Sequence, residues 1–393
     1  MKKLLVLFIM LIKVNVMAED NLLVVLNEGK VGDQNQLHGI VAELAKAKVK
    51  WSTGYLKNTQ ISELEVLADN ACKTSHPLVI LTSGPDGIDV IDKISNKLCS
   101  SVLVVNSAHM LFKSHLKILE YTNILALPSY SLDKEFEHKA DKAGTKIVQT
   151  LGVAHNITPQ KIEEEYTKFK DQFSWLEDTR KIAMIVLGGD APDADGKIHY
   201  YTTDEAVKTA KYIGDFCKAS GYKLMIFNGP RTGTYNPTTG EKDANAHTGE
   251  KLDNVTQSFM AEIANHLKSD QYKLYNFNKD SASPYKAGFR IVKNAEEGKC
   301  FLPGESTSMI SEANDYLASS TVIINNNAMN DSHHKHAILE AQAAKAILLG
   351  TDLQEIKVKV DSKLSKKAAK SNVALIAEQI AEDYENLAKN KKD

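Results

Sequence analysis

Residues 182–190, with the sequence IAMIVLGGD, decide how this chain folds. The first six of these residues are all apolar, which predicts a strand buried on both faces, as in a parallel sheet. Two glycines end the strand. A helical pattern over residues 203–220 follows, with Gly221 at the position of a C-cap. A short buried strand, a turn and a helix form the first half of a βαβ unit.

The same alternation of short apolar runs and helical patterns continues on both sides of this stretch. A helical pattern over residues 284–297 has Gly298 as its expected C-cap. Both halves of the chain are therefore predicted to be α/β with a parallel sheet. Further strands are predicted at residues 21–26, 78–81, 102–105, 124–127, 147–149, 224–227, 274–277, 300–302 and 321–324.

The two series of strands predict two domains. A chain of 393 residues has room for two at roughly 100–200 residues each. Thr158-Pro159 reads as an N-cap followed by proline at the first helical position, and it introduces a highly charged stretch between the two series. We expect an N-terminal Rossmann-like domain over residues 19–159, a linker helix over 160–180, a C-terminal Rossmann-like domain over 181–350 and a helical segment over 351–393.

The overall charge of the chain is balanced. Lysine and arginine together number 48, and aspartate and glutamate number 50, for a net charge of −2. This balance argues against a nucleic-acid partner, because such proteins usually carry a basic excess or a basic stripe. The hydrophobic share of 43% is ordinary for a globular protein and suffices for two cores.

The N-terminus has the pattern of a targeting segment. Lys2 and Lys3 precede an apolar run over residues 4–12, and Val16-Met17-Ala18 offers small residues at the spacing of a cleavage site. The apolar run is short for a membrane span, which needs about 20 residues. We therefore expect residues 1–18 to be a signal peptide and the mature protein to be exported to the periplasm. An uncleaved membrane anchor and a cytoplasmic protein with a misleading start are the alternatives.

Four cysteines occur in the chain, Cys72, Cys99, Cys217 and Cys300. Export permits disulfides, and the pairs Cys72–Cys99 and Cys217–Cys300 are conceivable because each lies within one expected domain. All four border apolar segments, however, so free buried thiols are the favoured interpretation. No CxxC occurs, which disfavours a zinc or thioredoxin-like site.

A short histidine cluster consists of His333, His334 and His336. Its i, i+3 spacing could bind a metal, but the sequence offers no evident carboxylate or cysteine partner. A solvent-exposed helix start is the favoured interpretation, and no metal site is predicted.

Polar residues follow three predicted strands of the second half, at the edge where open parallel sheets bind ligands. Gly188-Gly189 would let a ligand approach the backbone, and Arg231-Thr232 follows Pro230 with a guanidinium placed for a phosphate. Ser306-Thr307-Ser308 precedes a helix whose free N–H groups would attract an anion, and Glu312 could accept hydrogen bonds from ribose hydroxyls. Together these segments predict a diphosphate site.

Each of these segments also has a structural alternative. A glycine pair occurs in plain tight turns, an arginine can serve the packing of a domain, and Ser/Thr residues before a helix often form an ordinary N-cap. Neither GxGxxG nor GxxxxGK[ST] occurs, so neither a dinucleotide fingerprint nor a P-loop is supported.

The first strand is followed by a polar loop at residues 27–36, with the sequence NEGKVGDQNQ. Asp33 in this loop could act as a general base. It could equally cap the following helix, which is the favoured interpretation from residue type alone.

In their order and spacing, several segments resemble the mitochondrial-fission "elongated mitochondria" family, of which this chain would be a bacterial-type member. The resemblance covers about residues 20–350 and is specific as an ensemble. It rests on Gly29-Lys30 with residues 32–36, and on residues 152–158, 185–190, 230–232, 283–285 and 306–313. One departure is Gly304-Glu305, where the family usually has an aspartate.

The family looks like the GT-B glycosyltransferases. The resemblance therefore implies two Rossmann-like domains whose parallel sheets face a central cleft, with the donor nucleotide on the C-terminal domain. It implies a catalytic Asp33 on the acceptor side, no metal and no cofactor. The implied substrate-binding residues are Gly32 and Gln36 on the acceptor side, and Gly188, Gly189, Arg231, Thr232, Ser306, Thr307, Ser308 and Glu312 around the nucleoside diphosphate.

These features leave the function open between two readings. The resemblance implies a metal-independent glycosyltransferase that moves a sugar from a nucleoside-diphosphate sugar to an unknown acceptor. The signal-like start favours a different reading, because nucleotide sugars are cytoplasmic. The chain would then be a non-catalytic exported two-lobed binding protein or an inactive relative of the glycosyltransferases.

Overall fold

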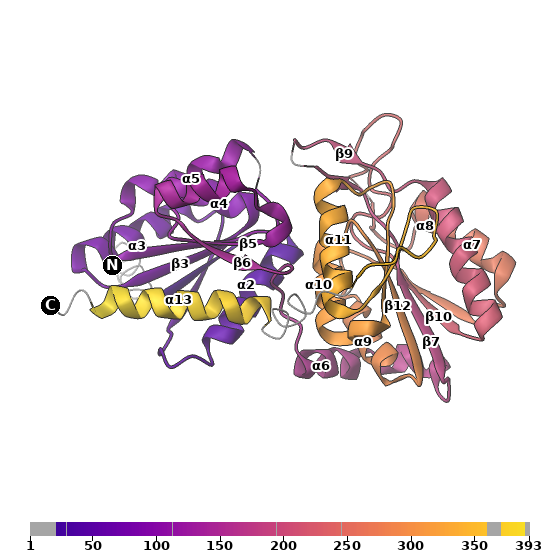
Figure 1. Cartoon of the computed structure of the whole chain (residues 1–393). Coiled ribbons are helices and arrows are strands. Elements are labelled where there is room, and N and C mark those ends of the chain that lie inside the picture. The colour runs from indigo at the N-terminus through magenta and orange to yellow at the C-terminus, as the bar shows by residue number, and fades with distance from the viewer. Residues whose placement is uncertain are drawn as a thin grey trace, which may run out of the picture. The chain divides into compact units, whose positions relative to one another are not determined.

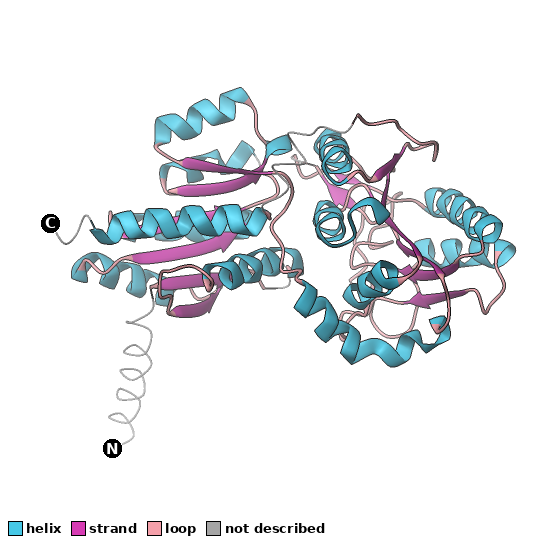
Figure 2. Ribbon diagram, turned by 60° about the horizontal axis from the view of Figure 1, so that its bottom comes forward, coloured by secondary structure: helices cyan, strands magenta, loops and turns pink. Residues whose placement is uncertain are grey.

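The structure is a computed structural model, and it describes residues 21–389 except residues 29, 112, 194, 245 and 360–370. The described residues form two compact units (Figure 1). The first contains the described residues up to Asn156 together with the C-terminal helix, and the second runs from Ile157 to the residues before that helix. Each unit is a twisted parallel sheet flanked by helices (Figure 2).

The sheet of the first unit has six strands in the order β2-β1-β3-β4-β5-β6, and each neighbouring pair is parallel. The strands are β1 (Leu22–Leu26), β2 (Thr53–Lys57), β3 (Leu78–Ser83), β4 (Val102–Ser107), β5 (Ile124–Pro128) and β6 (Lys146–Thr150). The helices are α2 (Val31–Leu44), α3 (Ile61–Thr74), α4 (Gly84–Ile94), α5 (Lys134–Ala143) and α13 (Asn372–Lys389), with short 3₁₀ turns at Ser95–Lys97, Lys113–Glu120 and Ser129–Ser131.

Alternate residues of these strands enter two separate cores, because successive side chains of a strand point to opposite faces. Leu22 packs with Leu37 of α2 and Ile376 of α13 on one face. Leu23 packs with Leu64 of α3 and Ile88 of α4 on the other. Burial on both faces explains why the inner strands β1, β3, β4 and β5 are rich in Leu, Ile and Val.

The sheet of the second unit has the order β11-β10-β7-β12-β13-β14, again with parallel neighbours. Its strands are β7 (Lys181–Val186), β10 (Lys223–Phe227), β11 (Tyr272–Tyr275), β12 (Glu297–Pro303), β13 (Thr321–Ile324) and β14 (Ile347–Leu349). Its helices are α6 (Pro159–Phe169), α7 (Thr203–Ser220), α8 (Asn254–His266), α9 (Tyr285–Asn294), α10 (Thr307–Leu317) and α11 (Asp331–Ala344), with 3₁₀ turns at Lys170–Leu176 and Ala318–Ser320. A separate antiparallel pair, β8 (Ala191–Pro192) and β9 (Ile198–His199), follows β7.

Both strand orders contain a point where the direction of winding reverses. In the second unit this point lies between β7 and β12, as in Rossmann folds, and in the first unit it lies between β1 and β3, as in flavodoxin-like folds. The predicted fold class, α/β with two Rossmann-like parallel sheets, is therefore confirmed. Ligands of such sheets bind beyond the strand ends at the reversal.

The predicted linker helix, which forms α6, and the predicted C-terminal helix, which forms α13, each pack within one of the two units. Ile162 of α6 lies in the core of the second unit, and Arg290 of α9 pairs with Glu163. The C-terminal helix α13 packs on the first unit against α2 (Figure 1). There Lys146 Nζ lies 2.6 Å from Asp383 Oδ1.

The structure corrects the expected helix end at Gly298. Helix α9 ends at Asn294, and Gly298 lies in β12, where it pairs with Ile182. A Cβ added at Gly298 would lie 2.0 Å from the Val292 carbonyl oxygen. The glycine therefore serves the close approach of a strand to the preceding helix and not a helix cap.

The favoured reading of four free cysteines is wrong for one pair. Cys72 and Cys99 form a disulfide with 5.9 Å between their Cα atoms. Cys217 and Cys300 are free and buried. They do not pair with each other because they belong to different cores on opposite faces of the second sheet. The expected signal peptide or anchor at residues 1–18 lies outside the described residues, and no helix among those described is long and apolar enough to span a membrane.

Candidate functional site

The reversal point of the second sheet brings together segments that are far apart in the sequence. Gly189 follows β7, and Glu305 follows β12. The backbone N–H of Gly189 donates a hydrogen bond to Glu305 Oε1 at 2.7 Å. The other oxygen of Glu305 accepts a hydrogen bond from the amide of Asn326, after β13. Glu305 is almost fully buried, and burial raises its pKa above the usual range, although the Asn326 bond and the Arg231 charge act in the other direction. Glu305 thus fixes the glycine turn beside the start of α10.

Arg231, after β10, lies against the same turn. A Cβ added at Gly189 would lie 2.8 Å from Arg231 Cβ, and the N–H of Asp190 donates to the Arg231 carbonyl at 3.0 Å. The Arg231 side chain is exposed, and no carboxylate among the described residues forms an ion pair with it. A guanidinium left without an ion-pair partner beside a glycine turn is suited to a phosphate.

Helix α10 begins at this point without the cap that its sequence suggests. Ser306 occupies the N-cap position, but its side chain accepts no hydrogen bond from the first turn. The alternative of an ordinary Ser/Thr cap is therefore wrong. The N–H groups of Thr307 and Ser308 begin the helix, and the positive end of the helix dipole lies there. Met309 brings this turn close to the β10 loop, since its methyl carbon lies 3.8 Å from a Cβ added at Gly229.

Glu312 and Thr232 lie nearby but are engaged within the protein. Glu312 is buried one turn into α10, close enough to Tyr285 for its charge to matter. Burial, followed by the charge of Glu312, raises the pKa of the Tyr285 hydroxyl. The Thr232 hydroxyl accepts from the Gly229 N–H at 3.0 Å, and the Thr232 carbonyl accepts from His247 Nε2 at 2.9 Å. Thr232 therefore shapes the loop that carries Arg231.

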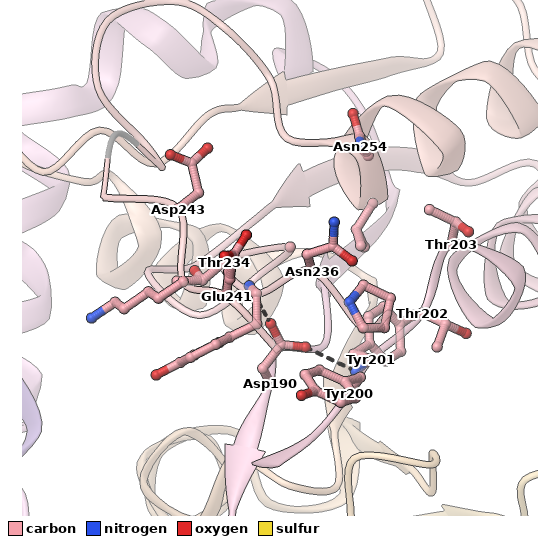
Figure 3. A pocket seen from close by; sticks show the side chains of 15 residues that line it. Asp190, Tyr200, Tyr201, Thr202, Thr203, Thr234, Asn236, Glu241, Asp243 and Asn254 are labelled. Atoms are coloured by element: carbon pink, nitrogen blue, oxygen red, sulfur yellow. Dashed lines mark hydrogen bonds between the residues drawn. The ribbon is translucent and has the colours of Figure 1, made fainter. Parts of the chain in front are cut away.

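Sequence reasoning gave no role to Asp190. Its buried carboxylate accepts from the backbone N–H of Tyr201 at 3.1 Å and of Tyr235 at 2.9 Å (Figure 3). Burial raises the pKa of Asp190, and the two backbone hydrogen bonds oppose this effect. The only signal in the sequence was the position of Asp190 directly after Gly189. Its partners lie 11 and 45 residues away in sequence, so the pairing itself was not visible.

The first unit has its own polar cluster at the reversal point between β1 and β3. Asn27, after β1, donates its amide to Asp33 Oδ2 at 2.9 Å and to the Ser83 carbonyl at 2.7 Å. Gly84 has φ +60°, and a Cβ there would lie 2.7 Å from Asp33 Oδ2. Glycine is thus required for the close approach of α4 to this carboxylate.

Asp33 does not cap a helix. Helix α2 begins at Val31, so Asp33 lies inside its first turn, and the favoured cap interpretation is wrong. Asp33 is buried, and burial raises its pKa, while the Asn27 hydrogen bond and the charge of Lys30 act in the opposite direction. A buried carboxyl with a raised pKa at the carboxyl ends of parallel strands is a candidate functional group.

The other two predicted residues of this loop differ in exposure. The Gln36 side chain is buried and accepts a hydrogen bond at 2.9 Å from the hydroxyl of Ser107, the last residue of β4. Gly32 is exposed. The structure thus brings Asp33 and Gln36 to one sheet edge, together with buried Asn27 and Asn106, whose amide oxygens have no partner among the described residues.

The expectation of a solvent-exposed histidine cluster is wrong for two of its three members. His333 is buried and completes a capping box with Asn330, and His336 is fully buried beside Glu340. Ser311 Oγ of α10 donates to Glu340 Oε1 at 2.7 Å, so this network joins α11 to α10. Among the residues that the structure describes, no His/Cys/Asp/Glu group is arranged to hold a metal ion.

Comparison with known proteins gives one family match. The model of the family "Mitochondrial fission ELM1" matches residues 126–253, which run from β5 to the residue before α8. This match confirms the resemblance predicted from the sequence over these residues, which include Gly188, Gly189, Arg231 and Thr232, while the segments at residues 29–36, 283–285 and 306–313 lie outside the match. No curated protein matches the chain.

Several solved structures share the general architecture. MurG of Acinetobacter baumannii has 10% identity and a TM-score of 0.41, and the match covers 94% of this chain and 99% of MurG. UDP-GlcNAc 2-epimerase of Neisseria meningitidis bound to UDP-GlcNAc has 10% identity and a TM-score of 0.48, covering 94% and 93%. An alpha,alpha-trehalose-phosphate synthase (UDP-forming) of Burkholderia vietnamiensis has 9% identity and a TM-score of 0.46, covering 94% and 100%. This likeness concerns architecture alone.

Proposed function

We propose that this chain, whose residues 126–253 match the mitochondrial fission ELM1 family, is a GT-B-like glycosyltransferase that binds a nucleoside-diphosphate sugar through its second unit. The observation that carries the proposal is the meeting of three segments at one reversal point. The Gly188-Gly189 turn, Arg231 and the uncapped start of α10 all contact one another directly or through Glu305.

The chemistry follows from the charge of the substrate. An acceptor hydroxyl oxygen attacks the anomeric carbon, and the bond from that carbon to the diphosphate oxygen breaks. Negative charge then grows on the leaving diphosphate. The N–H groups of Thr307 and Ser308 and the Arg231 guanidinium stabilise that charge, with the hydroxyls of Ser306, Thr307 and Ser308 as further donors. Glu312 would accept from a ribose hydroxyl.

The acceptor side is proposed for the first unit, where Gly32 and Gln36 accompany Asp33. The hydroxyl that attacks must lose a proton, and Asp33 is the proposed base. Burial raises its pKa and so makes it a stronger base than an exposed aspartate. Asn27, which donates to the carboxylate, holds it in one orientation.

The proposal is tested by titrating the purified chain with UDP, ADP, GDP and CDP in EDTA, and by following heat release. We expect at least one nucleotide to bind. Arg231→Ala should weaken this binding by about 10- to 100-fold, the equivalent of one charge-assisted contact. Arg180→Ala is the matched control, since Arg180 is also exposed but precedes β7, at the opposite edge of the same sheet, and pairs with Glu296. Absence of binding, or equal effects of the two variants, refutes the donor site.

The Cys72–Cys99 disulfide favours a second candidate. Disulfides persist mainly in oxidising compartments, so the bond supports export to the periplasm, by cleavage of residues 1–18 or with these residues as an anchor. An exported chain would lack a cytoplasmic donor and would act as a binding protein. Sequencing the N-terminus of the mature protein from cell fractions tests the location. Sugar transfer by the purified chain would exclude the binding-protein candidate.

A further inference from the structure

We propose that a polar pocket of the second unit is a binding site for a neutral saccharide. The pocket has a volume of about 500 Å³, which suits a ligand of one or two sugar rings. It lies between residues 200–203, which lead into α7, the loop at residues 233–243 and the start of α8 (Figure 3). The inference goes beyond the proposed function and does not depend on it.

The pocket is separate from the candidate diphosphate site. None of Arg231, Ser306 or Thr307 lines it. Asp190 and Tyr201 stand between the two places, because the Tyr201 ring would lie 2.4 Å from a Cβ added at Gly188. A ligand in the pocket would therefore use different side chains from a diphosphate at α10.

The walls of the pocket are held in place by hydrogen bonds. Asp190 binds the backbone of both Tyr201 and Tyr235, which fixes the two chain segments that carry Tyr200 and Tyr235. The loop at residues 233–243 is closed by hydrogen bonds from the Asn236 N–H to the Glu241 carbonyl and from the Asp243 N–H to the Thr234 carbonyl, both 2.9 Å. The site is thus formed before a ligand arrives, which lowers the entropic cost of binding.

The aromatic and amide groups of the pocket suit a sugar ring. Tyr200 and Tyr235 are half-buried, and each presents a flat apolar face with a polar tip. The Asn236 side chain lies in the middle of the view in Figure 3, among the other labelled polar groups. Its oxygen is engaged by the Thr238 N–H at 2.9 Å, while its NH₂ has no partner among the described residues. That group is available to a ligand hydroxyl.

The charge of the lining disfavours anionic ligands. Asp190, Glu241 and Asp243 line the pocket against a single basic residue, Lys242, so an anion would meet a net negative wall. The carboxylates accept hydrogen bonds from hydroxyl groups, as do the hydroxyl of Thr203 and the amide oxygen of Asn254. A ligand rich in hydroxyls, with C–H faces to lie on tyrosine rings, satisfies both requirements.

Saturation-transfer NMR on the full chain tests this inference with four probes: methyl α-glucoside, N-acetylglucosamine, maltose and chitobiose. We expect transfer to the ring protons of at least one probe. Asn236→Ala and Tyr235→Ala should each weaken its binding by about 10-fold or more, and Tyr235→Phe, which keeps the ring, by less than Tyr235→Ala. If Tyr235→Ala is too unstable to measure, Tyr235→Phe and Asn236→Ala still test the site.

Arg231→Ala separates this inference from the donor site. It should bind the saccharide like the unaltered chain while binding the nucleoside diphosphate about 10- to 100-fold more weakly. Three results overturn the saccharide site: no transfer to any probe, unchanged binding in both alanine variants, or stronger binding of choline or inorganic phosphate in the same pocket. A chain that binds saccharides but no nucleotide would overturn only the donor proposal.

Discussion

Gly189 lies in close contact with Arg231. Replacing Gly189 by alanine, which adds one methyl group, therefore tests whether this contact holds Arg231 in place. In Gly189→Ala the new Cβ would lie 2.8 Å from Arg231 Cβ, 2.9 Å from its carbonyl carbon and 3.1 Å from its carbonyl oxygen. Carbon atoms prefer about 3.5–4.0 Å, so the backbone of Arg231 must retreat by several tenths of an ångström. This movement strains the bond from the Asp190 N–H to the Arg231 carbonyl and the bond from the Gly189 N–H to Glu305.

The expected cost of Gly189→Ala is about 1–3 kcal/mol of unfolding free energy, the usual range for overpacking. For a unit of this size, such a loss lowers Tm by roughly 2–12 °C. Nucleoside diphosphate binding should weaken by about 10-fold, because the guanidinium moves from its place. Differential scanning calorimetry and calorimetric titration measure the two effects on the same sample.

Gly229→Ala is the matched control, since Gly229 belongs to the neighbouring loop. The nearest atoms to its added Cβ are Met309 Cε at 3.8 Å and Thr232 Oγ1 at 4.0 Å, which are ordinary contacts. Neither glycine has a positive φ, so backbone strain does not separate the two variants. We expect Gly229→Ala to change stability by less than about 0.5 kcal/mol. Equal effects of the two variants, or full tolerance of Gly189→Ala, would show that the close approach does not hold Arg231.

Three further predictions concern other parts of the chain. Asp33→Asn should lower sugar transfer by about 100-fold or more, as expected for a lost general base. Burial raises the pKa of Asp33, so its stabilising contribution is complete below the ordinary aspartate range and is lost as pH rises through the raised pKa. The variant should therefore equal or exceed the unaltered chain in stability at neutral pH, and a large loss of Tm there would contradict this. Glu340→Ala removes the buried carboxylate that His336, Ser311 and Asn314 contact and should cost about 3–5 kcal/mol in denaturant unfolding, whereas Glu262→Ala, at a surface pair with His266, should cost much less. Burial raises the pKa of Glu340, but the hydrogen bond and charge of His336, with bonds from Asn314 and Ser311, lower it overall, so this contribution is lost as pH falls below the ordinary glutamate range. Alkylation of the denatured, unreduced chain should label two of the four thiols, and replacing Cys72 and Cys99 by serine should cost about 3 kcal/mol for a loop spanning 27 residues; four labelled thiols would exclude the disulfide.

The sequence predicts most of the sheet framework, because buried parallel strands carry their own signal. The run at residues 182–187 and its counterparts are apolar on both faces, and the structure confirms strands there. Strand β2 was missed since its residues, TGYLK, lie at the edge of the sheet and alternate between buried and exposed. Gly298 was misread for a different reason. A glycine after a helical pattern suits a C-cap, and only the structure shows that it serves a close approach.

The candidate site was predictable in place but not in detail. Residues after strands gather at one edge of a parallel sheet, so Gly188, Arg231 and Ser306 could be grouped from their positions alone. The roles of Glu305 and Asp190 depend on hydrogen bonds between loops more than 10 residues apart, up to 116 for Glu305 with Gly189. Helix α2 begins at Val31, which removes Asp33 from the cap position, and its N-cap residue, Lys30, provides no side-chain cap that the sequence could have revealed.

The place of helix α13 has a consequence for the order in which the protein is made. Residues 372–389 supply Ile376, Ala377 and Ile380 to a core whose other buried members are synthesised more than 200 residues earlier. The N-terminal part of the first unit is translated first, yet the core on one face of its sheet is not complete until residues 372–380 are translated. The middle of the chain can complete its own fold sooner. A stop codon before Asn372 would therefore damage the first unit, although most of it is translated first, and would spare the second unit.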